Sequence, residues 1–239
     1  MAERLDEIGF GGLKLYQDDQ CFCYGIDAVL LADFAKANKG DNILDLCSGN
    51  GIVSFIAAAL YFPQHIDAVE ILEKSAFLGR KSAQINGFDK LVEVHNIDLK
   101  TADKSLKKGS YDLVTCNPPY TEKGAGNVND FSDLEIARHE STASLDDIFR
   151  ISSLMLKPKG KLSMVHRPSR LADLIDLARK YNLEPKELRM VVPRKGEAPN
   201  IVLINYVKGA GKELKIYPEL VVRNQTGEYT EEINKIYRR

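Results

Sequence analysis

Residues 42–56 of the 239-residue chain read NILDLCSGNGIVSFI, and this segment is the most informative about the fold. Its first five residues have the apolar pattern of a buried strand, and residues 52–61 have the composition of a helix. The turn between them lets the backbone bend sharply and approach a ligand closely, above all at Gly49 and Gly51. A strand, a glycine turn and a helix in this order predict a ligand site at the carboxyl edge of a sheet. Two alternatives are a turn that binds a dinucleotide and a turn that is needed only for folding.

Strand and helix patterns alternate through most of the remaining chain. Further strands are predicted at 65–70, 91–95, 111–116, 161–166, 186–192 and 201–207, and helices at 73–86, 145–156 and 169–181. The last two strands have only a turn-rich segment between them, which predicts a hairpin. We therefore expect an α/β fold, a Rossmann-like, doubly wound and mostly parallel seven-stranded sheet with an antiparallel last strand.

The two ends of the chain flank this α/β domain, which we place at residues 40–208. Residues 1–39 form an N-terminal lead-in, a polar turn and an apolar helix packed on the core. Residues 209–239 form a C-terminal extension with a short apolar run at 219–222 and a helix at 230–237. We expect one domain with two decorated ends.

Composition excludes several classes of protein. With 44% hydrophobic and 28% charged residues the chain is neither disordered, collagen-like nor a coiled coil. Its apolar segment 52–62 is too short for the about 20 residues of a membrane span, and the N-terminus lacks the pattern of a secretory signal, so we expect a cytoplasmic protein without membrane contact. The four cysteines are scattered and read as reduced thiols, and the four histidines have no spacing that suggests a metal site.

Charge is unevenly distributed, although the net charge is −1. Residues 157–195 carry eleven Lys or Arg against four Asp or Glu, a net of +7. Basic side chains near predicted strand ends can meet phosphates at the rim of a site, and a solvated surface is the alternative. The candidates for contact with a nucleic acid are Lys157, Arg167, Arg170, Arg194 and Lys195.

Glu70 closes the second strand, 25 positions after Asp45. The carboxyl ends of neighbouring parallel strands meet at one edge, so Glu70 is expected beside the glycine turn. A carboxylate there can accept the hydrogens of both hydroxyls of an adenosine ribose. The spacing therefore predicts a nucleoside-containing cofactor.

The fourth strand ends in Asn117-Pro118-Pro119-Tyr120. The side-chain oxygen of Asn117 and the carbonyl of Pro118 can both accept hydrogens from a planar amino group, and Tyr120 can stack on its ring. The prolines fix the backbone without donating hydrogen bonds. Such acceptors would aim the nitrogen lone pair at an electrophilic methyl group, so catalysis would be positioning with electrostatic stabilisation.

These motifs resemble the class I methyltransferases that use S-adenosylmethionine, and Asn-Pro-Pro-Tyr is typical of their amino-group-modifying branch. Within it, the chain is most similar to the tRNA adenine-N6 methyltransferases that modify the adenine beside the anticodon of a valine tRNA. Residues 24–31, YGIDAVLL, match the lead-in of that family. Residues 194–200, 220–223 and 229–232 resemble its last loop and its tail more loosely.

The resemblance implies a methyltransferase domain at 40–208, S-adenosylmethionine as cofactor, RNA as partner and no metal. It places Asn117, Pro118 and Tyr120 in catalysis. It assigns cofactor binding to Tyr24, Asp27, Asp45, Cys47, Ser48, Gly49, Asn50, Gly51, Glu70, Asp98 and Asn117.

Some of these positions have a second interpretation. Cys47 stands where the family usually has glycine. Asp98 falls where the family places an acid against the adenine amine of the cofactor, but it can equally be a turn or helix-cap residue, and Asp27 can be an ordinary cap.

Alternative functions remain open at this point. Release-factor glutamine methyltransferases share the Asn-Pro-Pro-Tyr motif, but they have a longer helical N-terminal domain than the lead-in of this chain. Ribosomal RNA guanine-N2 methyltransferases usually have Phe in place of Tyr120. A nicotinamide dehydrogenase would use the same turn and Glu70, but its third glycine position is Ser54 here. A non-catalytic RNA-binding domain is the last alternative.

Overall fold

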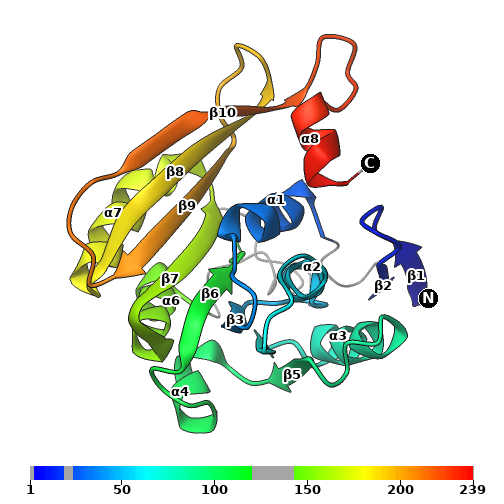
Figure 1. Ribbon diagram of the computed structural model, residues 1–239, viewed down its shortest axis with the longest axis vertical. Helices are drawn as coiled ribbons and strands as arrows, with labels where there is room; N and C mark the ends of the chain where they lie inside the picture. The colour runs from blue at the N-terminus through cyan, green and yellow to red at the C-terminus, as the bar shows by residue number, and fades with distance from the viewer. Residues whose placement is uncertain (1–2, 19–23, 120–142, 239) are drawn as a thin grey trace, which may run out of the picture.

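The computed structural model describes residues 3–18, 24–119 and 143–238 (Figure 1). Its centre is an eight-stranded sheet with the order β10-β8-β9-β7-β6-β3-β4-β5. β9 pairs antiparallel with β7 and β8, and the other neighbouring strands pair parallel. The strands are β3 (Asn42–Leu46), β4 (His65–Glu70), β5 (Val92–Asn96), β6 (Tyr111–Cys116), β7 (Leu156–His166), β8 (Leu183–Arg194), β9 (Ile201–Lys208) and β10 (Lys215–Arg223).

Helices cover both faces of this sheet (Figure 1). One apolar core lies under α1, α2 and α3 and the other under α6 and α7, so β3 gives Ile43 to the first and Leu44 and Leu46 to the second. This alternation follows from the two-residue period of a strand. The helices are α1 (Ile26–Ala35), α2 (Ile52–Tyr61), α3 (Glu73–Ile85), α4 (Ala102–Ser105), α6 (Leu145–Met155), α7 (Leu171–Lys180) and α8 (Glu231–Ile236), with 3₁₀ turns η1 (Leu99–Thr101) and η2 (Pro168–Arg170).

The predicted doubly wound, mostly parallel sheet with one antiparallel strand is confirmed, with one strand more than the seven expected. The eighth is β10, from the C-terminal segment, which pairs parallel with β8. Only Leu220 of this edge strand is buried, and the register shifts around Pro218. A strand with so little buried surface carries a weak apolar period, which is why the pattern predicted only a short run there.

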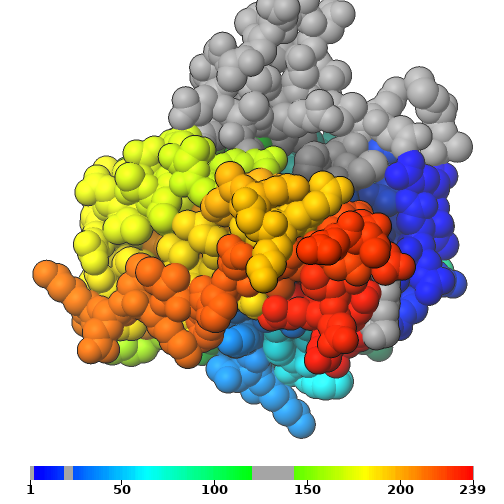
Figure 2. All heavy atoms as spheres, turned by 90° about the horizontal axis from the view of Figure 1, so that it is seen from above, coloured from blue at the N-terminus to red at the C-terminus, as the bar shows by residue number. Residues whose placement is uncertain are grey.

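Both ends of the chain pack on the central domain. A hairpin of β1 (Arg4–Glu7) and β2 (Lys14–Gln17) lies on α3, where the backbone N–H of Tyr16 donates to Ser82 Oγ at 3.0 Å. α8 contacts α1 and β10, and the rings of Tyr229 and Tyr237 stack at 5.7 Å. The loop after β8 and the turn after β10 neighbour each other in both views (Figures 1 and 2).

Among the helices in the described part of the chain, none combines the length and the apolar character needed to cross a bilayer.

Candidate functional site

The carboxyl ends of β3, β4 and β6 reach the same level of the sheet. Leu46 lies opposite both Val69 and Cys116, so the turn after β3, Glu70 and Asn117 follow at one edge. The chain continues from β3 toward β4 and β5 on one side, and β6 and β7 lie on the other. β3 and β6 therefore flank the topological switch point, where open α/β sheets bind their ligands.

The turn between β3 and α2 has three residues in the left-handed region, Cys47 (φ 56°), Gly49 (φ 56°) and Gly51 (φ 91°). A Cβ on Gly51 would lie 2.7 Å from the Phe55 ring, so this position needs glycine for space as well as conformation. A Cβ on Gly49 would have no neighbour within 4 Å among the described residues, which leave the backbone there open. Cys47 adopts its conformation at a cost of about 1–2 kcal/mol, which accounts for the glycine usual in the resembling family.

Glu70 points its carboxylate at this turn. One oxygen accepts the backbone N–H of Gly49 and the other that of Leu72, both at 2.8 Å, and the residue is 7% exposed. Burial raises the pKa of the carboxyl, and the backbone N–H groups of Leu72, Gly49 and Ile71 oppose the rise. A carboxylate has about four acceptor sites, so Glu70 keeps acceptor capacity for a ligand's hydroxyl group.

Asp45 lies beneath the turn rather than on it. Its two oxygens accept the hydroxyls of Ser54 and Thr115, each at 2.7 Å, and it is 1% exposed. Burial raises its pKa to about 6 against the opposing effect of the two hydroxyls. The carboxylate thus joins β3, α2 and β6 under the predicted cofactor turn, and Ser54 and Thr115 had no sequence signal for this role.

Asn117 and Pro118 follow β6 directly, with Pro118 buried and Asn117 half-buried. Tyr120 lies outside the described residues, as does the segment around His139. Cys116 is fully buried beside Cys47, and burial together with the Cys47 thiol raises its pKa. Cys47 and Cys116 are both free thiols, as predicted.

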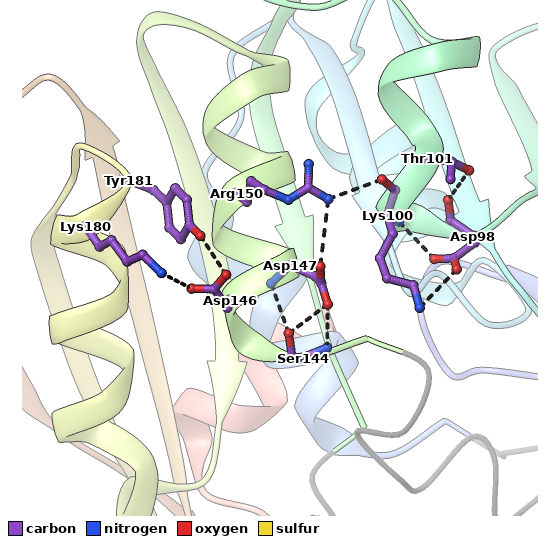
Figure 3. Close-up of polar contacts among 9 residues, drawn as sticks. All are labelled: Asp98, Lys100, Thr101, Ser144, Asp146, Asp147, Arg150, Lys180 and Tyr181. Carbon is purple, nitrogen blue, oxygen red and sulfur yellow. Dashed lines mark hydrogen bonds and ion pairs between the residues drawn. The ribbon is translucent and has the colours of Figure 1, made fainter.

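Asp98 caps η1 two residues beyond β5 (Figure 3). Its carboxylate accepts the backbone N–H of Lys100 at 2.9 Å and lies 3.3 Å from the ammonium of the same residue. Arg150 of α6 donates to the carbonyl of Lys100 at 3.2 Å, and a capping box of Ser144 and Asp147 starts that helix. The helix-cap interpretation of Asp98 therefore describes its contacts, and Arg150 of α6 contacts the turn that Asp98 caps.

Tyr24 and Asp27 lie at the start of α1. The N-cap is Gly25, with no side-chain cap, and Asp27 stands in the first turn. The Asp27 carboxylate folds back over Gly25, where any Cβ would collide with it. Asp27 is therefore not the cap of this helix.

Two amide side chains at this edge make contacts that the sequence did not predict, although Asn50 itself was among the predicted cofactor-binding residues. Asn50 donates to the carbonyl of Tyr16 in β2 at 3.3 Å, so the lead-in contacts the predicted cofactor turn. Asn96 donates to the carbonyls of Glu70 and Ile71 at 3.0 and 2.9 Å and holds the end of β4. Both contacts join segments that are distant in the sequence, so no local pattern could reveal them.

His166 ends β7 at the same edge and is fully buried. Its Nδ1 accepts the backbone N–H of Arg167 at 2.8 Å, and burial lowers its pKa to about 4 although this N–H opposes the change. The ring is therefore neutral near neutral pH and serves as an acceptor. Its position agrees with the core or surface role expected from sequence.

Four of the five predicted basic residues lie at the edge that carries Asn117. β7 and β8 run parallel to β6, and their carboxyl ends bring Arg167 and Arg194 to this edge. Arg167 donates to the carbonyl of Asn200 at 3.1 Å, and Arg194 lies 3.4 Å from Glu197. We call this set the basic rim: Arg167, Arg170, Arg194 and Lys195.

Lys157 does not belong to the basic rim, so its prediction was wrong. It stands near the amino end of β7, and its ammonium pairs with Asp112, at the amino end of β6, at 2.7 Å. The amino ends of parallel strands lie at the edge opposite the candidate site. Sequence placed Lys157 near a strand end but could not say which one.

The comparisons with known proteins agree with this geometry. The family model "Methyltransferase small domain" matches residues 15–175. Several curated tRNA1(Val) (adenine(37)-N6)-methyltransferases are similar to the chain, and the one from Parabacteroides distasonis is 28% identical over 197 residues, which cover 82% of this chain and 81% of that protein.

Solved structures share the fold. A predicted O-methyltransferase from Agrobacterium tumefaciens superposes with a TM-score of 0.73 at 21% identity, over 89% of this chain and 95% of that one. Geranyl diphosphate C-methyltransferase from Streptomyces coelicolor A3(2), solved with S-adenosyl-L-homocysteine, superposes with a TM-score of 0.56 at 14% identity, over 77% and 75%.

Proposed function

The chain belongs to the methyltransferase small domain family, and from this membership we propose that it transfers the methyl group of S-adenosylmethionine to the N6 amine of an adenine in tRNA, beside the anticodon. The observation that carries the proposal is the position of Asn117 and Pro118 at the switch point, across from the glycine turn and Glu70. Family membership rules out the dehydrogenase and the non-catalytic RNA-binding domain.

The glycine turn and the carboxylate beside it fit the cofactor. The described residues leave the backbone at Gly49 open, and Glu70 keeps acceptor capacity for a ribose hydroxyl while it holds the turn. Asp98, which caps η1, would accept from the adenine amine with a lone pair not used in capping. When bound, S-adenosylmethionine supplies an electrophilic methyl group on a sulfonium.

The end of β6 fits a planar amine. Asn117 and Pro118 would accept its two hydrogens, which turns the lone pair out of the plane and toward the methyl group. Tyr120, from the same motif, would stack on the base. The amine needs no general base before attack, because its nitrogen becomes acidic once it carries the methyl group and then releases a proton.

The basic rim supports a polyanionic substrate. Its residues lie on the same edge of the sheet as Asn117, where phosphates of an RNA would pass if its base entered the site. The names of the relatives point more narrowly to a valine tRNA with an adenine beside the anticodon.

The decisive experiment offers the purified protein and methyl-labelled S-adenosylmethionine to an unmodified valine tRNA transcript. We expect N6-methyladenosine in the digest, and none when the adenine beside the anticodon is replaced by guanine. Parallel reactions contain a release factor or a ribosomal RNA transcript. Label in glutamine or in guanine would contradict the adenine assignment and favour one of the two rival methyltransferases.

A further inference from the structure

Side chains that commonly ligate metals gather where β4 pairs with β5, away from the methyl-transfer site. Asp67 of β4 lies opposite Glu93 of β5, and the two-residue period puts His65 and His95 on the same face of the sheet. Asp67 is three residues before Glu70, so the cluster lies about 10 Å along β4 from the site at a rise of about 3.3 Å per residue. None of the proposed roles above uses it.

The distances in this cluster fit a small cation. One ligand atom each from His65, Asp67 and Glu93 lies within 4.8 Å of the others. His65 Nε2 is 3.3 Å from Asp67 Oδ1, close to the separation of about 3.4 Å between two ligands of a tetrahedral zinc ion with bonds of about 2.0–2.2 Å. Glu93 is 66% exposed, so its side chain has room to close the remaining gap.

The Asp67 carboxylate is already oriented by its neighbours. Tyr111 donates its hydroxyl to Oδ2 at 2.7 Å, and His95 Nε2 lies 2.7 Å from Oδ1. Each carboxylate oxygen has two lone pairs, so Oδ1 can keep the contact with His95 and still bind a cation. Hydrogen bonds of this kind to a ligating carboxylate are a general feature of metal sites.

We propose that His65, Asp67 and Glu93 bind a divalent transition-metal ion such as Zn²⁺, with His95 and Tyr111 as positioning residues. One imidazole and two carboxylates suit zinc or cobalt, and the site leaves a fourth position to water. His65 is 36% exposed, so an ion can reach the cluster from solvent. The ion would fasten the edge strand β5 to β4 and take no part in methyl transfer.

The test uses the full-length protein after chelator treatment. Calorimetry with Zn²⁺ should give one ion per chain, and Zn²⁺ at about a hundredfold over its dissociation constant should raise Tm by about 5–10 °C. Co²⁺ should give the visible absorption of a tetrahedral complex. Glu93→Gln and His65→Gln should each weaken binding at least about tenfold, and Tyr111→Phe by about 10–100-fold.

Two controls keep the outcome interpretable. Glu73→Gln alters a glutamate in the first turn of α3, outside the cluster, and should bind as the unmodified protein does. Replacing Cys21 and Cys23 by serine removes the Cys-x-Cys pair, a rival zinc ligand in the sequence. The proposal is overturned if Zn²⁺ does not bind, if Glu93→Gln and His65→Gln bind normally, or if the cysteine variant loses the ion. Methylation by Glu93→Gln should be unchanged, which separates this result from the proposed function.

Discussion

Asp45→Asn is expected to make the protein more stable near neutral pH, because a buried carboxylate is replaced by a neutral amide of the same shape. Asp45 is 1% exposed, and its oxygens accept from Ser54 and Thr115. An amide can accept from one of these hydroxyls and donate to the other. The substitution therefore removes the charge and leaves each hydroxyl with one hydrogen bond to the amide.

The magnitude follows from the pKa of Asp45, raised by burial from 3.8 to about 6. The folded state holds the proton more tightly than the unfolded state, so this group's contribution to stability is largest at low pH. The contribution falls as the pH rises through the two pKa values and is constant above them. Its full size is about 3 kcal/mol, of which about 2 kcal/mol falls between about pH 4.5 and about pH 7.5.

Urea unfolding followed by circular dichroism measures the free energy of unfolding of both proteins at these two pH values. The free energy of unfolding of the variant, minus that of the unmodified protein, should be about 2 kcal/mol larger at the higher pH than at the lower pH. Asp112→Asn is the matched control. Burial acts to raise the pKa of Asp112, but Lys157 and the backbone N–H of Asn42 hold it below its usual value of 3.8, so its contribution is lost only at lower pH and its difference should stay nearly constant between these two pH values. A pH-independent difference for Asp45→Asn would refute the reasoning.

Four other perturbations test the candidate site. Glu70→Ala should weaken S-adenosylmethionine binding by about 1.5–3 kcal/mol in titration calorimetry, the range for hydrogen bonds to a charged group, and unchanged affinity in a folded variant would remove Glu70 from the site. Asn117→Ala should leave that affinity intact but slow single-turnover methylation at least about a hundredfold, and a nearly normal rate would exclude the amine-acceptor role. Cys47→Gly should raise the free energy of unfolding by about 1 kcal/mol in urea because it relieves a left-handed φ of 56°, and a loss of stability would show that the thiol's packing outweighs the strain. Reversing the charges of the basic rim should make the slope of log affinity against log salt shallower in filter binding to tRNA, by about 0.7–0.9 for each phosphate that the variant no longer neutralises, whereas Lys157→Glu, on the opposite edge, should leave the slope unchanged.

Residue patterns predicted the parts of this protein that depend on local order along the chain. The strand at 42–46, the turn with Gly49 and Gly51, and the motif beginning at Asn117 each occupy a strand end that the apolar pattern marks. In a parallel sheet the carboxyl ends of neighbouring strands share one edge, so residues at those ends could be brought together without coordinates. Even the unusual Cys47 was visible as a departure from glycine, and its positive φ supplies the reason.

Features that depend on pairing between distant segments became visible only in the folded protein. The edge strand β10 pairs with β8, and its sparse apolar pattern does not encode this partner. His65 and Glu93 are separated by most of a strand-helix-strand unit and meet only because β4 and β5 pair in one register. Lys157 lies at the edge opposite the candidate site. The sequence shows that a basic residue is near a strand, but not at which edge of the sheet that end of the strand lies. The family resemblance implies a cofactor role for Asp45, and its two hydroxyl partners come from a helix and a neighbouring strand, whose packing no local pattern could reveal.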